Sequence, residues 1–265
     1  MTMSIDKAIL LVEDNLVNQK LAQKILALLG YKVKTVSDGQ EAVLLYQKCY
    51  EAFVLILMDG EMPVLNGFEA TKEVRQWEKL NNYPPIPIIA WTASYGLREN
   101  QQKWIAVGVN DFLSKPFRID EVKRVLSRWL SGGEIQQSTS LLTKVQDPNL
   151  QTDQSKLETA AIQQLLLLQK NSPGLIKRLI IKYEQQGSEL LQQLILCHQQ
   201  ENQQGIRKAA HTLKSSSAGL GALALASACE HIEQNPADFE AIEKQLQELS
   251  VLFKQALYGL DQLQV

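Results

Sequence analysis

Two patterns of hydrophobic and polar residues divide this chain. Up to about residue 131, short apolar runs alternate with longer stretches of helical periodicity, whereas beyond about residue 155 the apolar residues recur only at spacings of three and four. The first pattern is typical of alternating strands and helices, and the second of helices alone. The chain therefore predicts an α/β domain followed by an all-α domain.

The first half contains five short apolar runs that we expect to form strands. Runs that are nearly continuously apolar indicate strands buried on both faces, as in a parallel sheet. A helical stretch follows each run, which predicts a doubly wound five-stranded parallel sheet. The expected strands are 8–12, 32–36, 53–58, 86–91 and 111–113, and the expected helices lie near 16–29, 39–49, 67–79, 96–107 and 119–131.

A polar stretch with little periodicity separates the two halves. It opens at Ser131-Gly132-Gly133 and continues to about Ser155. A stretch of this composition is typical of a flexible linker. We therefore expect a first domain over residues 1–131, a linker over 132–154 and a second domain over 155–265.

The second half is expected to form an antiparallel four-helix bundle with a short helix before it. Its helices are predicted near 157–170, 173–200, 202–218, 221–234 and 236–260. Two starts are marked by Ser172-Pro173 and Asn235-Pro236, because each places a side-chain acceptor at the N-cap and a proline at the first helical position. Two long and two medium helices joined by short turns favour the bundle.

Composition and charge exclude several classes of function. The 265 residues include 27 Lys and Arg against 29 Asp and Glu, so the formal charge of -2 supplies no basic field for nucleic acid. The three cysteines are far apart, which argues against a disulfide framework or a zinc site. The apolar runs fall far short of the ~20 residues that span a membrane, and the N-terminus does not resemble a signal peptide. We expect a cytoplasmic protein.

Polar side chains follow four of the five expected strands, at the edge of the sheet where ligands bind in open α/β folds. Glu13 and Asp14 follow the first strand, Asp59 the third, Thr92 the fourth and Lys115 the fifth. Any one of these could be an ordinary loop or cap residue, but their coincidence favours a site. Three adjacent carboxylates repel one another unless a cation is bound, and oxygen ligands suit Mg²⁺. One carboxylate could then attack phosphorus, with a hydroxyl and an ammonium group on the phosphoryl oxygens.

The segments around these residues resemble the response-regulator receiver domain of two-component signalling, which has a flavodoxin-like fold, over about residues 5 to 131. The resemblance implies that Asp59 is the phosphoacceptor, as a 4-aspartylphosphate, and that the domain catalyses its own phosphorylation. It also implies that Glu13, Asp14 and Asp59 hold Mg²⁺, with a backbone carbonyl from Glu61. The matching segments are Val12-Glu13-Asp14-Asn15, Met58-Asp59-Gly60-Glu61-Met62-Pro63, Thr92-Ala93 and Ser114-Lys115-Pro116-Phe117.

The same resemblance implies how phosphorylation is sensed. Lys115 would pair with the phosphoryl group, and the Lys115-Pro116 peptide bond would be cis. Thr92 and Phe112 would form a switch pair, in which the ring turns inward when the threonine hydroxyl is drawn to the phosphate. The change would be read on the face formed by the fourth helix, the fifth strand and the fifth helix.

His211 is the histidine with the most reactive setting in the second half. At about 100° per residue it shares a helix face with Arg207, Lys208, Lys214 and Ser215, so we expect it to be exposed among cationic and small neighbours. A neutral imidazole there is a good nucleophile near pH 7, and cations would stabilise a phosphoryl group on its ring.

The other two histidines, His198 and His231, lack such a setting. His198 ends a predicted long helix, where the helix dipole favours a cation, and His231 lies among acidic residues. Both are expected to be ordinary helix residues without a chemical role.

The segment around His211 resembles the histidine-containing phosphotransfer (HPt) domain, over about residues 155 to 262. The resemblance implies that His211 carries phosphate on a ring nitrogen and that Lys214 supports it. Ser215 stands where this family commonly has glycine, which predicts that docking survives while the rate or the choice of partner differs. The matching segments are Ala210-His211-Thr212-Leu213-Lys214-Ser215-Ser216-Ser217, Leu220-Gly221-Ala222 and Cys229-Glu230.

Together these features predict a phosphorelay protein. Asp59 would take a phosphoryl group from a phosphohistidine of a sensor histidine kinase, and His211 would carry it to or from a receiver aspartate, in the same chain or in another response regulator. The only suggestive glycine pair, in Gly219-Leu220-Gly221, fits a helix connection better than a nucleotide loop, so we expect no ATP-dependent kinase activity.

Four alternatives stay open at this point. The chain could be the C-terminal receiver and HPt piece of a hybrid histidine kinase, or a scaffold that acts without phosphorylation. An aspartyl hydrolase would want a second aspartate two residues after Asp59, where the chain has Glu61. A flavin-binding carrier would share the sheet but would not need three carboxylates in its pocket.

Overall fold

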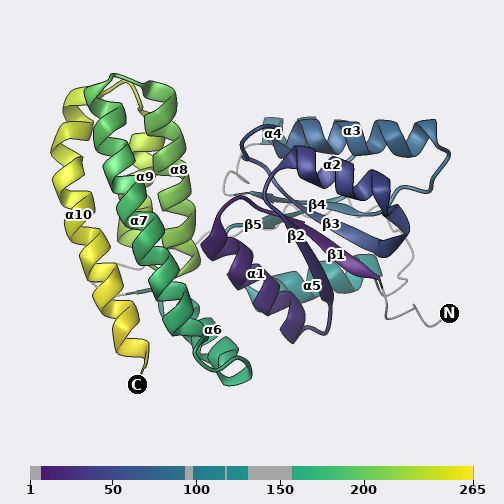
Figure 1. The fold of residues 1–265 in the computed structure, drawn as a ribbon, viewed down its shortest axis with the longest axis horizontal. Coiled ribbons are helices and arrows are strands. Elements are labelled where there is room, and N and C mark those ends of the chain that lie inside the picture. The colour runs from purple at the N-terminus through teal and green to yellow at the C-terminus, as the bar shows by residue number, and fades with distance from the viewer. Residues whose placement is uncertain (1–6, 93–97, 117, 131–156, 265) are drawn as a thin grey trace.

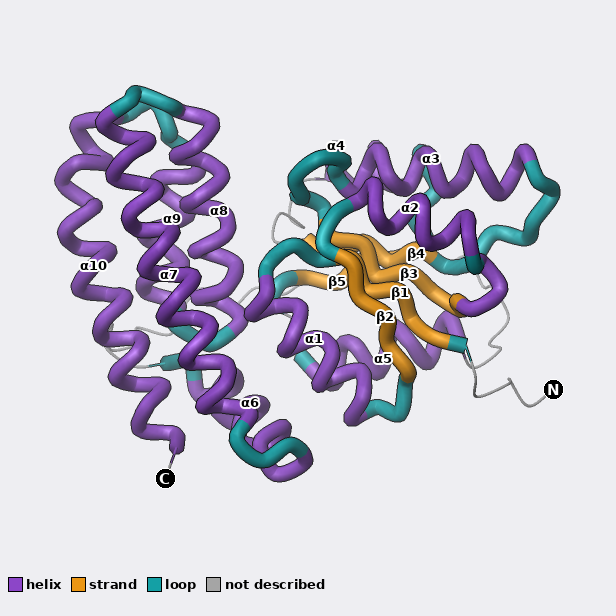
Figure 2. Tube along the Cα trace, in the orientation of Figure 1, coloured by secondary structure: helices purple, strands orange, loops and turns teal. Residues whose placement is uncertain are grey.

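The structure, a computed structural model, describes residues 7–92, 98–116, 118–130 and 157–264 (Figure 1). The predicted linker over 132–154 lies outside the described residues. An α/β domain stands beside an upright bundle of helices, so the predicted fold class is confirmed (Figure 2). None of the helices in the described ranges combines the length and the apolarity that a membrane span requires.

The sheet of the first domain is parallel and has the strand order β2-β1-β3-β4-β5. The central strands β1, β3 and β4 are buried along almost their whole length, as predicted, whereas β2 lies at an edge and alternates between exposed and half-buried residues. The strands are β1 (Ala8–Val12), β2 (Lys32–Val36), β3 (Phe53–Asp59), β4 (Ile88–Thr92) and β5 (Asp111–Ser114).

Helices cover both faces of this sheet (Figure 1). One face carries α1 (Leu16–Leu28) and α5 (Ile119–Leu130), and the other carries α2 (Gly39–Lys48), α3 (Gly67–Leu80) and α4 (Arg98–Ala106). Alternate residues of each strand point to opposite faces, so the sheet divides the apolar core into two clusters. A short 3₁₀ turn, Tyr50–Ala52, precedes β3.

The second domain contains four helices in a bundle, preceded by α6 (Thr159–Asn171). The bundle helices are α7 (Leu175–Gln199), α8 (Gln203–Gly219), α9 (Leu223–Gln234) and α10 (Phe239–Asp261), with a 3₁₀ turn, Gln262–Gln264, after them. The bundle core includes a T-shaped contact between the rings of Tyr183 and Phe253, whose centroids are 5.2 Å apart.

The two helix starts predicted from proline are wrong by two or three residues. α7 begins at Leu175, after Gly174 adopts a left-handed conformation with φ of 72°. α10 begins at Phe239, because the side chain of Asp238 accepts a hydrogen bond from the backbone N–H of Ala241 and caps the helix there. In both cases the proline lies in the turn before the helix.

The two domains are packed against each other through α1, which contacts α6, α7 and α8. One cluster of buried apolar side chains runs from the sheet and α1 into α6 and α7, and it includes Leu165 and Leu168 of α6. The side chain of Gln164 accepts a hydrogen bond from the backbone N–H of Ile119 at 3.0 Å, at the start of α5. This packing turns the carboxyl edge of the sheet toward α8 (Figure 1).

We expect the Gly187→Ala variant to be destabilised, because a methyl group at this buried position of α7 would lie 2.3 Å from the ring of Phe253. The ring must move from its place against Tyr183, and overpacking of this kind typically costs about 1–3 kcal/mol. Urea unfolding measures the change. Ser188→Ala, at the exposed neighbouring position, is the matched control, and equal stability of the two variants would contradict the expectation.

Candidate functional site

A cluster of acidic side chains occupies the carboxyl edge of the sheet. Glu13 and Asp14 follow β1, and Asp59 is the last residue of β3. One carboxylate oxygen of each lies within 4.8 Å of the others, and Glu13 and Asp59 are almost completely buried. The predicted convergence of these three side chains is therefore present.

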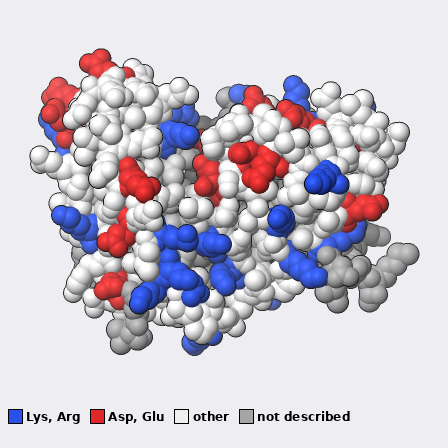
Figure 3. Space-filling model, viewed as in Figure 1, with Lys and Arg blue, Asp and Glu red and all other residues white. Residues whose placement is uncertain are grey.

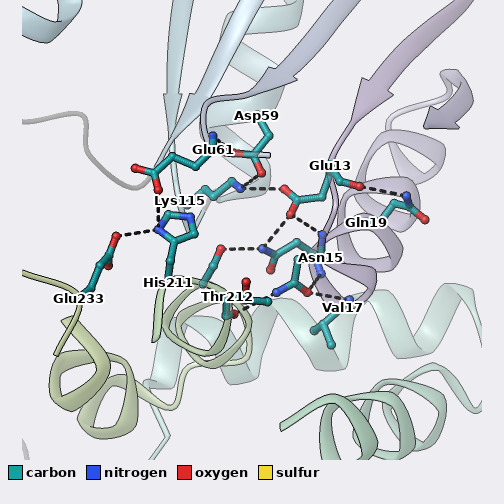
Figure 4. Close-up of polar contacts among 12 residues, drawn as sticks. Glu13, Asn15, Val17, Gln19, Asp59, Glu61, Lys115, His211, Thr212 and Glu233 are labelled. Carbon is teal, nitrogen blue, oxygen red and sulfur yellow. Dashed lines mark hydrogen bonds and ion pairs between the residues drawn. The ribbon is translucent and has the colours of Figure 1, made fainter. Parts of the chain in front are cut away.

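Lys115, directly after β5, neutralises part of this charge. Its ammonium nitrogen lies 2.8 Å from an oxygen of Glu13 and 2.8 Å from an oxygen of Asp59 (Figure 4). The same nitrogen lies 5.0 Å from the ring centroid of Trp91, which is buried at the end of β4 and forms a cation–π contact that the sequence reasoning missed. The Lys115-Pro116 peptide bond is cis, as the resemblance implied.

The pocket still holds more negative than positive charge. Burial, and then the charge of Asp59, raise the pKa of Glu13 to about 8 and that of Asp14 to about 6. Burial alone would lower the pKa of Lys115, but its contacts with the two carboxylates outweigh burial and raise it. Three hard oxygen donors with an excess of negative charge are a donor set that fits Mg²⁺.

Glu61, which follows Asp59 by two residues, reaches away from this pocket. Its backbone N–H lies 3.4 Å from an oxygen of Asp59, while its carboxylate points toward the second domain (Figure 4). The side chain therefore contributes to the contact between the domains. The prediction for Glu61 concerned only its backbone carbonyl, as a ligand of Mg²⁺.

The predicted switch residues lie on one cavity beside the pocket. Thr92 ends β4 and Phe112 lies in β5, and both are partly buried. They line a cavity of about 460 Å³ that is also bordered by Gly60 and Trp104. A side chain on Gly60 would approach the hydroxyl of Thr92 to 3.4 Å, so the backbone after Asp59 passes close to this threonine.

His211 projects from α8 toward the carboxyl edge of the sheet in the first domain (Figure 4). Its Nδ1 lies 2.7 Å from an oxygen of Glu233 and 3.3 Å from an oxygen of Glu61. The expectation that His211 is exposed is wrong, because the first domain covers this helix face and leaves only 13% of the side chain accessible. Burial lowers the pKa of His211, but Glu233 and Glu61 outweigh burial, so the pKa is raised.

Glu233 of α9 is the residue that sequence reasoning missed. Besides its contact with His211, it pairs with the ammonium group of Lys214 at 2.5 Å, and these two cationic partners lower its pKa against the raising effect of burial. The available signal was its spacing of four from Cys229 and its position next to Ile232, which place it on the buried face of α9. A carboxylate on such a face needs partners.

The other two histidines have no such surroundings. Nε2 of His198 lies 2.8 Å from the backbone oxygen of Phe239, and His231 is exposed. His211 is thus the histidine that the fold brings to the acidic pocket.

Polar contacts join the two domains around His211. The side-chain amide of Asn15 donates to the backbone oxygen of Thr212 at 3.1 Å, and that of Asn18 donates to the hydroxyl of Ser215 at 2.7 Å. Both donors belong to the N-terminal end of α1, and both acceptors lie within one turn of His211.

A cleft of about 500 Å³ remains open beside these contacts. Asp14 and Glu61 line it from the first domain, and Arg207 and Lys208 from the second. In Figure 3, acidic and basic side chains face each other across the groove between the domains. The acidic pocket and the basic helix face are therefore electrostatically complementary.

Comparison with known proteins agrees with this geometry. Residues 9–127 match the family described as response regulator receiver domain, and residues 178–262 match the Hpt domain. Hybrid signal transduction histidine kinase B of Dictyostelium discoideum is 43% identical over 122 residues, which are 43% of this chain and 6% of that protein. Sensor protein GacS of Pseudomonas syringae pv. syringae is 36% identical over 121 residues, which are 46% of this chain and 13% of that protein.

A solved structure is similar over the first half alone. The receiver domain of sensor histidine kinase PA1611 from Pseudomonas aeruginosa, crystallised with a magnesium ion in its active-site cleft, is 42% identical and covers 47% of this chain and 98% of its own, with a TM-score of 0.42. The match spans only a small part of the two curated relatives but nearly the whole of the solved receiver domain, and in this chain it lies in the first domain.

We expect Lys115→Ala to destabilise the fold, because it leaves the carboxylates of Glu13 and Asp59 buried without their ammonium partner. Removing one partner of a buried ion pair costs about 3–5 kcal/mol. Urea unfolding with EDTA present measures the loss, and Lys72→Ala, at an exposed position of α3, is the control. A loss no larger than that of the control would contradict the assigned contacts.

Proposed function

Because this chain carries a response regulator receiver domain at residues 9–127 followed by an Hpt domain at residues 178–262, we propose that it relays phosphoryl groups between Asp59 and His211. The observation that carries the proposal is that the imidazole of His211 lies beside the acidic pocket of the same chain, 3.3 Å from the carboxylate of Glu61, two residues after Asp59 (Figure 4). Two reactive groups held at one interface need little further ordering before they react.

The charge of the pocket supports a magnesium requirement. Glu13, Asp14 and Asp59 supply three carboxylate oxygens, and we assign a fourth ligand to the backbone carbonyl of Glu61. When bound, Mg²⁺ would neutralise charge on the phosphoryl oxygens. Lys115, already in contact with Asp59, can turn its ammonium group to those same oxygens. The hydroxyl of Thr92, on the cavity that it shares with Phe112, would donate a hydrogen bond to one of them.

The transfer moves one phosphoryl group between an oxygen and a nitrogen. The bond between phosphorus and the Asp59 oxygen breaks, and a bond forms between phosphorus and Nε2 of His211, while Asp59 leaves as a carboxylate. Glu233 holds Nδ1, so Nε2 is the nitrogen that is left for attack. In the neutral ring Nδ1 keeps its proton, and the positive charge that develops on the ring is stabilised by Glu233.

The partners follow from this chemistry. Asp59 would receive its phosphoryl group from a phosphohistidine of a sensor histidine kinase, and His211 would pass it to, or take it from, a receiver aspartate. Transfer in both directions would use the same contacts, so phosphoryl groups could flow forward from Asp59 to His211 or backward from His211 to Asp59. Lys214, which pairs with Glu233, would support the phosphorylated ring from α8.

We expect labelled acetyl phosphate with Mg²⁺ to place phosphate on His211 by way of Asp59. The label on His211 should be acid-labile and stable to base, and it should disappear in His211→Ala and in Asp59→Ala, because Asp59 is the entry point. EDTA should abolish both labels. His231→Ala, at an exposed histidine of α9, is the matched control and should keep the label. Folded protein with label on neither residue would contradict the proposal.

We expect Glu233→Ala to slow the transfer from Asp59 to His211 by about tenfold or more, because the imidazole loses the acceptor that orients it. Glu233→Gln retains an oxygen that can accept from Nδ1 and should be slowed less. Rapid-quench measurement of label on the two residues separates this step from the loading of Asp59, which should not change. Equal rates in both variants and the parent chain would show that Glu233 does not orient the ring.

A further inference from the structure

Ser215 and Asn18 form a buried hydrogen bond between the two domains. The side-chain amide of Asn18 donates to the Ser215 hydroxyl at 2.7 Å, and only 4% and 5% of these residues are exposed. Ser215 lies one helical turn after His211 on α8, so the bond forms beside the reacting side chain.

Asn18 is held in place from the receiver side. Its amide nitrogen also lies 3.4 Å from an oxygen of Glu13, and Glu13 belongs to the acidic pocket. The backbone N–H of Asn18 donates to the side chain of Asn15, which caps α1. The amide that meets Ser215 is therefore tied to the same pocket as Asp59.

The surface of α8 beside Ser215 leaves room for the side chain of Asn18. Gly219 follows Ser215 by one further turn of α8, and a methyl group on Gly219 would lie 3.0 Å from the side-chain oxygen of Asn18. α8 thus offers one hydroxyl and one position without a side chain to a single residue of α1. A longer side chain in place of Asn18 would meet Gly219, and an apolar one would bury the Ser215 hydroxyl without its donor.

We propose that the Asn18 and Ser215 pair determines which receiver docks on His211, and that it selects this chain's own receiver domain, in the same chain or in a second copy. The inference rests on the proposed transfer between Asp59 and His211. A buried hydroxyl that loses its partner weakens binding of a receiver that lacks the amide, and such an unpaired group is a common source of specificity.

The size of the effect follows from the bond. A hydrogen bond between uncharged groups changes an association constant by about three- to tenfold. The bond does not touch the reacting atoms, so it should alter the concentration at which two chains associate and leave the rate within the complex unchanged.

Transfer between two full chains tests this inference. The donor is the His211→Ala chain loaded on Asp59 with labelled acetyl phosphate, and the acceptor is the Asp59→Ala chain. In the parent acceptor its own receiver domain covers His211, so Asn18→Ala in the acceptor removes the bond within that chain and leaves Ser215 free to accept from Asn18 of the donor. The half-saturating acceptor concentration should then fall by about three- to tenfold, with the maximal rate within twofold. Adding Ser215→Ala to this acceptor removes the bond to the donor as well and should abolish the fall, as expected for residues that act on each other.

Ser216→Ala in the acceptor is the matched control. Ser216 is also buried on α8, but its hydroxyl donates to the backbone oxygens of Thr212 and Leu213 in its own helix. It should leave the half-saturating concentration unchanged, and thermal melting verifies that each variant folds. An unchanged half-saturating concentration with the Asn18→Ala acceptor, or a fall that persists after Ser215→Ala is added, would overturn the inference while the proposed function stands. Absence of transfer between the parent pair, and of label on His211 within one chain, would overturn both.

Discussion

Excess negative charge at the carboxyl edge of the sheet is the constraint on which this molecule depends. Three carboxylates lie together there with one buried ammonium group, that of Lys115, between two of them. The parallel sheet brings the ends of β1, β3 and β5 to one edge. Removal of Lys115 would leave the buried carboxylates of Glu13 and Asp59 without their cation. The same excess fits a divalent cation and complements the basic helix face opposite.

In the second domain, a chain of charged contacts positions His211 opposite this acidic edge. Nδ1 of His211 contacts the carboxylate of Glu233, and Lys214 pairs with the same carboxylate. Residues of its own bundle therefore orient the imidazole. Glu61 then adds a contact from the receiver. The ring is thus positioned by both domains. Small side chains around it, with Gly219 as the extreme case, allow α1 to approach closely.

Local patterns predict the elements and the convergence of the acidic side chains well, and the contacts between domains poorly. The strands are recovered to within two residues because apolar runs and their boundaries are local. The helix starts at Leu175 and Phe239 were missed because a left-handed Gly174 and the cap at Asp238 override the proline signal. The burial of His211, and the role of Glu233, depend on pairs of residues far apart in the chain. The periodicity of a single helix cannot predict such pairs, although it does place Glu233 on the buried face of α9.

The close packing of α6 against both domains has a kinetic consequence. Because α6 and α1 hold the first domain beside α8, the proposed transfer between Asp59 and His211 would take place within one molecule, as a first-order event. Dilution or a change in the copy number of the protein would then leave that step unaltered. Under the proposed function, the loading of Asp59 and the unloading of His211 would remain second-order, so the abundance of the kinase and of the final acceptor would set the flux.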